Sequence, residues 1–143
     1  DPRGIPTLMN AIASRDRRVS SIGCGAMQII TGHEEDLDTP GAKNRWKAWC
    51  ETNRGSFPEG TRHREGKVFD CGFLLERMGW DDAWVRRTAY DELVIASGCD
   101  LPYDAEGPWR VQTAHLDKWK RWWSKTRHTH VSGRWYLDGK QIH

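Results

Sequence analysis

Residues 82–98 read Asp-Ala-Trp-Val-Arg-Arg-Thr-Ala-Tyr-Asp-Glu-Leu-Val-Ile-Ala-Ser-Gly, and this stretch decides the fold. Its first residue, Asp82, is suited to cap a helix, because a carboxylate accepts the free N–H groups of the first turn and opposes the helix dipole. Small and apolar residues then recur at steps of three and four, namely Val85, Ala89, Leu93 and Ala96. Gly98 can end the helix in the left-handed conformation. The stretch therefore predicts one amphipathic helix that ends at Ser97.

The same pattern occurs earlier in the chain, with Asp16 and Gly32 in the places of Asp82 and Gly98. Further pairs at the same offset are Leu8 with Leu74, Val19 with Val85, Ile29 with Ile95, Asp38 with Asp104, and Gly41 with Gly107. A short insertion in the second copy then aligns the pair Trp46 and Trp49 with the pair Trp119 and Trp122. A tandem duplication of this size is typical of a stacked, solenoid-like architecture.

Each copy predicts three helices. The first covers residues 6–14 or about 70–78, the second ends at Thr31 or Ser97, and the third covers 43–53 or 109–126 and carries the Trp-x-x-Trp pair. In the first copy, the second helix has a stripe with helical spacing, formed by Val19, Ile22, Gly23, Ala26, Met27 and Ile30. We expect this stripe to be buried when the helices pack.

The chain is therefore expected to be all-α, with two tandem helical units in one compact domain. We place the first unit at 1–54, a polar linker loop at 55–69, the second unit at 70–127, and a terminal segment at 128–143. The Asp138-Gly139 pair between alternating segments favours a small C-terminal β-hairpin, or else an extended tail. A two-copy array often needs neighbours, so we expect the end of a longer protein or a chain that assembles with itself.

The stretch from Asp82 to Gly98 resembles the second half of a HEAT repeat, in which Asp is followed by Val-Arg, Ala, Leu and Gly. The first copy keeps Asp16, Val19 and Gly32 but has Ser20 at the Arg position. The Trp-x-x-Trp helix and the segment 58–66 are similar to parts of bacterial HEAT-like proteins, some of which are found near type VI secretion genes. The resemblance implies a HEAT-like α-solenoid that binds proteins, and it implies no catalytic residue.

Composition limits the other function classes. The net charge of +2 over 143 residues does not by itself indicate a polyanionic partner. The four cysteines lie far apart with no CxxC pair, so we expect free thiols, no zinc site and a cytoplasmic location. His128 and His130 have no nearby carboxylate or thiol to complete a metal site, and no apolar run is long enough to cross a membrane. We expect no metal and no cofactor.

The nine tryptophans divide into a structural group and a group of candidate contact residues. The four that recur in both copies are expected to be structural, whereas Trp80, Trp84, Trp109, Trp123 and Trp135 have no equivalents. Trp and Arg dominate the energetics of protein interfaces. We therefore predict that a partner protein, such as a secreted toxin or a secretion component, contacts the second copy. The predicted contact residues are Trp84, Arg86, Arg87, Tyr90, Asp91, Trp109 and Trp123.

Two alternatives remain open at this stage. The basic and aromatic helix 118–127 could bind nucleic acid, with cations on phosphates and rings stacked on bases. The cations concerned are Lys118, Lys120, Arg121, Lys125 and Arg127. The second alternative is a small hydrolase whose site forms only in the fold, because the sequence has no nucleophile elbow, phosphate-binding glycine loop or His-Glu-x-x-His motif.

Overall fold

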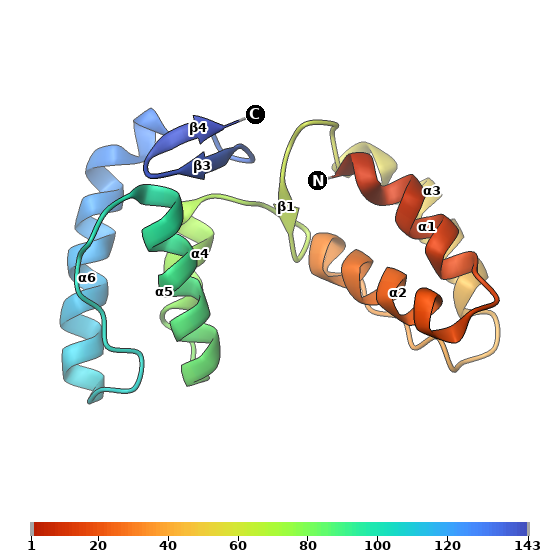
Figure 1. The fold of residues 1–143 in the computed structure, drawn as a ribbon, viewed down its shortest axis with the longest axis horizontal. Coiled ribbons are helices and arrows are strands. Elements are labelled where there is room, and N and C mark those ends of the chain that lie inside the picture. Colours follow the sequence, from red (N-terminus) through yellow and green to blue (C-terminus); the bar gives the residue numbers. More distant parts are fainter. Residues whose placement is uncertain (1, 143) are drawn as a thin grey trace. The chain divides into compact units, whose positions relative to one another are not determined.

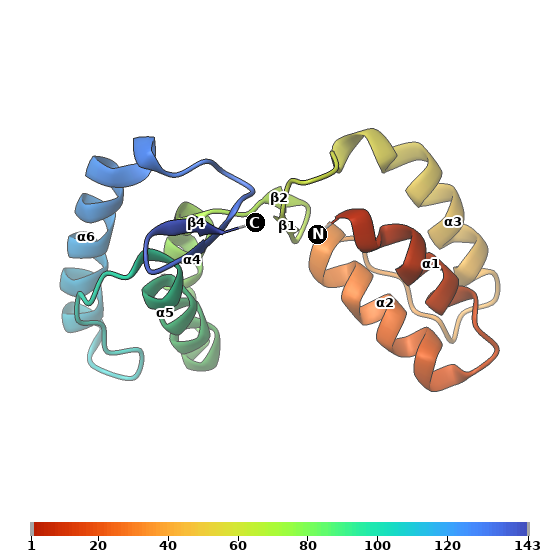
Figure 2. The same ribbon diagram turned by 45° about the horizontal axis from the view of Figure 1, so that its top comes forward.

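A computed structural model describes residues 2–142 (Figure 1). These residues form six α-helices and two antiparallel strand pairs, so the predicted helical class is confirmed. The chain divides into two compact units, Asp1–Val68 and Phe69–His143, which we call unit 1 and unit 2. Each unit contains three helices followed by one strand pair, the same order in both (Figures 1 and 2).

The elements of unit 1 are η1 (Pro2–Gly4), α1 (Ile5–Ala13), α2 (Arg17–Thr31), α3 (Ala42–Asn53), η2 (Arg54–Ser56), β1 (His63–Arg64) and β2 (Lys67–Val68). Those of unit 2 are α4 (Cys71–Arg77), α5 (Ala83–Ser97), α6 (Trp109–Thr126), η3 (Arg127–Thr129), β3 (Trp135–Leu137) and β4 (Lys140–Ile142). The second helices, α2 and α5, have the same length, and in each unit a 3-10 turn directly follows the third helix. The duplication predicted from sequence is therefore repeated in the order and spacing of the elements.

The caps of α2 and α5 form as predicted. Asp16 accepts hydrogen bonds from the N–H groups of Arg18 (2.8 Å) and Val19 (3.4 Å). Asp82 accepts one from the N–H of Val85 at 3.0 Å. At the other ends, Gly32 and Gly98 have φ values of 68° and 65°, which a residue with a Cβ adopts at a cost.

The linker is not the plain loop that we predicted, because it contains the β1–β2 hairpin. Its two-residue turn, Glu65-Gly66, has φ values of 53° and 77°. The predicted C-terminal hairpin is present and has the same turn, with φ values of 50° at Asp138 and 72° at Gly139. Two successive positive φ values define the type I′ turn, whose twist matches that of a hairpin. The Glu-Gly turn escaped prediction because Glu rarely adopts a positive φ.

Both hairpin turns bind the end of the second helix in their own unit. Glu65 and Gly66 donate their N–H groups to the carbonyls of Ile29 (2.7 Å) and Ile30 (3.1 Å). Asp138 and Gly139 do the same with Ile95 and Ala96, at 2.9 Å in both bonds. The carbonyls at the end of a helix lack partners within the helix. Each hairpin therefore supplies hydrogen-bond donors to carbonyls at the C-terminal end of the second helix and holds that end in place.

The recurring tryptophans are structural, as predicted. Trp46 and Trp119 have no exposed surface. Trp46 meets Trp49 edge to face with centroids 6.0 Å apart, and Trp119 meets Trp122 in the same manner at 5.4 Å. The repeat extends beyond the helices, since Trp49 contacts Phe57 at 5.9 Å and Trp122 contacts His130, the equivalent of Phe57, at 6.1 Å.

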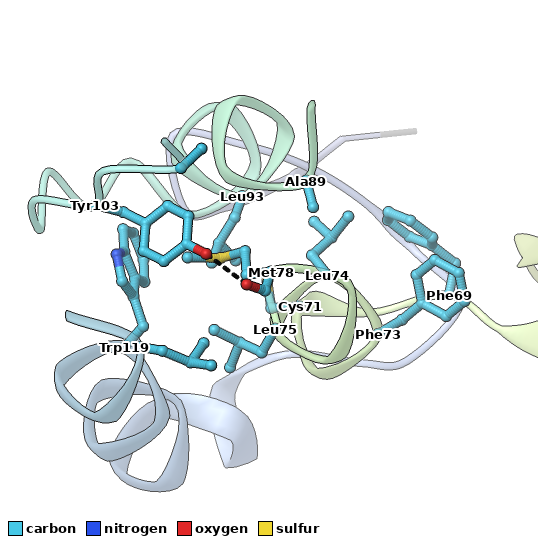
Figure 3. Packing of buried hydrophobic residues seen from close by; sticks show 12 residues of the cluster. Phe69, Cys71, Phe73, Leu74, Leu75, Met78, Ala89, Leu93, Tyr103 and Trp119 are labelled. Atoms are coloured by element: carbon cyan, nitrogen blue, oxygen red, sulfur yellow. Dashed lines mark hydrogen bonds between the residues drawn. The ribbon is translucent and has the colours of Figure 1, made fainter. Parts of the chain in front are cut away.

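The two units differ in the size of their cores. Among the described residues, the core of unit 1 has four buried members, namely Ile12, Cys24, Met27 and Trp46. The core of unit 2 has twelve, most of them from α4, α5 and α6 (Figure 3). Figure 3 also shows the Tyr103 hydroxyl donating a hydrogen bond to the Met78 carbonyl. Unit 2 is therefore expected to be the more stable of the two.

The predicted buried stripe of α2 is partly wrong. Val19 and Ile22 are exposed, with 43% and 72% of their surface accessible. The buried face keeps Gly23 and Met27 of the predicted stripe and adds Ser20, Cys24 and Thr31. The Ser20 hydroxyl donates to the Ile12 carbonyl at 2.9 Å, which makes a polar residue acceptable in this position.

Candidate binding sites

Arg86 is not a surface residue, which corrects the sequence-based prediction. Its side chain is buried, with 9% of the residue accessible. Nε and Nη2 donate to the Ala105 carbonyl at 2.9 and 2.7 Å. Nη1 donates to the carbonyls of Trp80 (2.7 Å) and Asp81 (2.6 Å). One guanidinium thus joins the turn before α5 to the loop before α6.

Three exposed tryptophans lie on the segments that Arg86 joins. Trp80 is in the turn before α5, Trp84 is in the first turn of α5, and Trp109 is the first residue of α6. Their accessible fractions are 48%, 74% and 63%. Helices α5 and α6 begin at the same end of unit 2 (Figures 1 and 2). We call Trp80, Trp84 and Trp109, with the segments that carry them (79–84 and 102–109), the tryptophan tip.

The tryptophan tip is acidic. Its two segments contain Asp81, Asp82, Asp104 and Glu106 and no Lys or Arg. Asp82 serves as the cap of α5, and Asp104 accepts the N–H of Glu106 at 3.1 Å. The Arg77 guanidinium lies over the Trp80 ring, 4.6 Å from its centroid, so the tip already binds one cation of its own unit. Segments that carry both exposed indoles and carboxylates suit a partner that presents cationic side chains.

The remaining predicted contact residues divide into two groups. Arg87 and Asp91 are exposed on α5 and form an ion pair at 3.7 Å. Tyr90 is half-buried, with its ring 5.6 Å from that of Tyr103, and Trp123 is also half-buried against the unit 2 core. Tyr90 and Trp123 are therefore only partly accessible to a partner, because both rings also pack within unit 2.

Unit 1 contains a groove that the sequence did not predict. It lies between α1 and α3, has a volume of about 970 Å³ and is bounded at one end by residues 54–59. Ile5, Met9 and Phe57 supply apolar walls, and the Cys50 thiol lies 3.4 Å from the Met9 sulfur. The volume is at the upper end of the range typical of ligand pockets. The one signal for it in the sequence is Cys50 at the position that Trp123 takes in the second copy.

The basic segment offers cations without free aromatic rings. The five cations predicted for nucleic-acid binding are all exposed, namely Lys118, Lys120, Arg121, Lys125 and Arg127. Trp119 is fully buried, and Trp122 and Trp123 pack against the core. Base stacking needs an accessible ring face. The geometry therefore leaves only the electrostatic part of that alternative.

The thiols are unsuited to nucleophilic catalysis. Burial raises the pKa of Cys24, Cys50 and Cys99 above the ordinary value of 9.0 and that of Cys71 to about 12. A catalytic cysteine needs the opposite shift, because the thiolate is the nucleophile. Over residues 2–142, no three His, Cys, Asp or Glu side chains are grouped so that they could hold a metal ion.

Comparison with known proteins adds no relative. No family model, no curated protein and no solved structure matches this chain. A search of the described helices for a candidate membrane span found none with the length and apolar character required.

Proposed function

We propose that this chain is a non-enzymatic protein–protein interaction module, a scaffold, adaptor or immunity-type protein whose two units are HEAT-like repeats of an α-solenoid. The observation that carries the proposal is the tryptophan tip, where three indoles remain exposed on segments joined by the buried Arg86. A tryptophan side chain provides a large contact area at a low cost in conformational entropy, so it is a common interface hot spot.

The chemistry of the tip defines the class of partner. Asp81 and Glu106, each three residues before Trp84 or Trp109 in the sequence, favour a protein surface that presents Arg or Lys. The resemblance to HEAT-like proteins of secretion loci makes a secreted toxin or a secretion component the first partner to test. Four free cysteines support placing this interaction in the cytoplasm.

Affinity capture with matched variants tests the proposal. We expect the wild-type chain to capture a stoichiometric protein, and the double variant Trp84→Ala/Trp109→Ala to lose it. Trp135→Ala is the control, because Trp135 is 45% exposed but lies outside the tip. With purified components, each tip variant should raise the Kd roughly thirty-fold, the effect of truncating a hot-spot tryptophan. Capture that is unchanged in the double variant would contradict the proposal.

A nucleic-acid function makes a different prediction in the same experiments. It requires binding to an oligonucleotide that weakens steeply with salt and is lost when the exposed cations of α6 are replaced. It also requires that the double variant Trp84→Ala/Trp109→Ala bind the oligonucleotide as tightly as the wild type does. That combination of results would favour the alternative over a protein partner.

A further inference from the structure

The groove of unit 1 corresponds to a position that unit 2 fills with an indole. A Cβ built on Gly72 would lie 3.1 Å from Nε1 of Trp123, so this indole rests directly on α4. In the alignment of the two copies, Cys50 of unit 1 stands in the place of Trp123, and Pro6 stands in the place of Gly72. A thiol fills far less space than an indole, and both Pro6 and Cys50 line the groove.

The groove carries a charge opposite to that of the tryptophan tip. Its lining includes four cationic residues, Arg3, Lys43, Lys47 and Arg54, and two acidic ones, Glu51 and Glu59. Lys43 donates to the Ser14 carbonyl at 2.6 Å, whereas Lys47 and Arg54 are exposed at the rim. An occupant should therefore combine an aromatic side chain for the apolar floor with carboxylates for the rim.

We propose that the groove of one copy of this chain accepts the tryptophan tip of a second copy. The tip supplies both parts of the required occupant, an indole at Trp84 that is 74% exposed and the carboxylates of Asp81 and Glu106. This inference rests on the proposed function, since it uses the same tip. It deepens that function by naming a partner, which is the chain itself.

The geometry of such a contact predicts its stoichiometry. The groove belongs to unit 1 and the tip to unit 2, so each copy carries one of each and the contact is heterologous. Heterologous contacts continue from copy to copy unless the rotation closes a ring. We therefore expect the mass of the wild-type protein to rise with concentration in sedimentation velocity. We also expect the association to weaken as salt screens the rim charges.

Two double variants separate the groove from the tip. Lys47→Glu/Arg54→Glu reverses the rim of the groove, and Asp81→Lys/Glu106→Lys reverses the tip while leaving the Asp82 cap intact. Each variant alone should raise the self-association Kd by tenfold or more, because it places like charges opposite one another at the contact. When the two are mixed, the intact tip of the first variant meets the intact groove of the second, and the acidic groove of the first meets the basic tip of the second. The mixture should therefore regain the association that neither variant shows alone.

A third variant tests occupancy of the groove without a change of charge. Cys50→Trp should fill the groove as Trp123 fills its counterpart, and it should abolish self-association while the circular dichroism spectrum stays helical. Cys50→Ala is the control and should associate like the wild type, because it leaves the groove open.

The outcomes distinguish this inference from the proposed function. A wild-type sedimentation coefficient that does not change with concentration overturns the self-association, as does a mixture of the two double variants that stays monomeric. If the tip variants nevertheless lose a captured partner protein, the proposed function stands and only the identity of the partner is wrong. If self-association is found but no variant of the tip alters it, the tip has no role in it and the inference fails.

Discussion

At the scale of single residues, Arg86 has a structural role, although the sequence predicted that it would contact a partner. Its guanidinium donates four hydrogen bonds to three main-chain carbonyls, those of Trp80, Asp81 and Ala105. A planar donor group with five N–H bonds is well suited to join two loops in this way. The tryptophan tip therefore depends on a residue that does not itself reach the surface.

Arg86→Met should destabilise the protein by about 2–4 kcal/mol, because the carbonyls of Trp80 and Asp81 lose their donor and that of Ala105 keeps only Gln112 at 3.3 Å. The neighbouring Arg87→Met is the control, since Arg87 is exposed with one surface ion pair worth at most about 1 kcal/mol. Urea unfolding followed by circular dichroism measures both values. Equal losses in the two variants would show that the network of Arg86 contributes little.

Cys71 predicts a loss of stability at high pH. Burial raises its pKa from 9.0 to about 12 in the folded chain. Below pH 9.0 the thiol is protonated in both states, and above it the unfolded chain ionises first, so the free energy of unfolding falls as pH rises towards 12. Between about pH 8 and about pH 10.5, Cys71→Ala should remove a decline on the order of 1–2 kcal/mol. Parallel pH profiles for the two proteins would contradict this.

At the scale of elements, the two hairpins differ in whether the sequence predicts them. Asp138-Gly139 is a strong hairpin signal and was predicted, whereas Glu65-Gly66 was not, although both adopt the same turn. Because each turn is bonded to the end of a helix, tertiary contacts impose the positive φ on Glu65. The turn propensity of Glu-Gly alone does not predict this conformation, because the hydrogen bonds that stabilise it involve residues far away in the sequence.

Gly139→Ala should weaken the hydrogen bonds between the C-terminal hairpin and the end of α5. Its φ is 72°, and a Cβ would lie 2.8 Å from the Ser97 carbonyl oxygen, so we expect a loss on the order of 1–3 kcal/mol. Gly25→Ala is the control, since Gly25 lies within α2 with no atom within 4 Å of an added Cβ and should gain roughly 0.5–1 kcal/mol. Thermal unfolding measures both changes. A neutral Gly139→Ala would show that the turn relaxes freely.

The helix boundaries could be predicted well because their signals are local. Asp16 and Gly32 limit α2, and the corresponding residues limit α5, by contacts within a few positions of the chain. The buried face of α2 could not be predicted in the same way. Steps of three and four fit both the exposed Ile22 and the buried Met27, and only the packing of neighbouring helices decides between them. Arg86 was misplaced for the same reason, since its partner Ala105 lies far along the chain.

At the scale of the whole molecule, the unequal cores predict unequal stability. Over the described residues, the core of unit 1 has four buried members and the core of unit 2 has twelve, so less apolar surface is removed from water in unit 1. In native-state hydrogen exchange, the amides of α2 and α3 should therefore exchange before those of α5 and α6. Uniform protection across all four helices would mean that the chain unfolds as one cooperative unit.

The internal repeat has an evolutionary consequence. Residues 14–18 read Ser-Arg-Asp-Arg-Arg, and the equivalent residues 80–84 read Trp-Asp-Asp-Ala-Trp. Both versions keep the aspartate that begins the following helix, while almost everything around it has changed in charge and bulk. In a gene that carries two copies of one helical unit, the residues that determine the fold can stay the same in both copies. Natural selection can then change the surface residues of each copy separately. Such a duplication lets an ancestral module acquire two dissimilar faces without inventing a second fold.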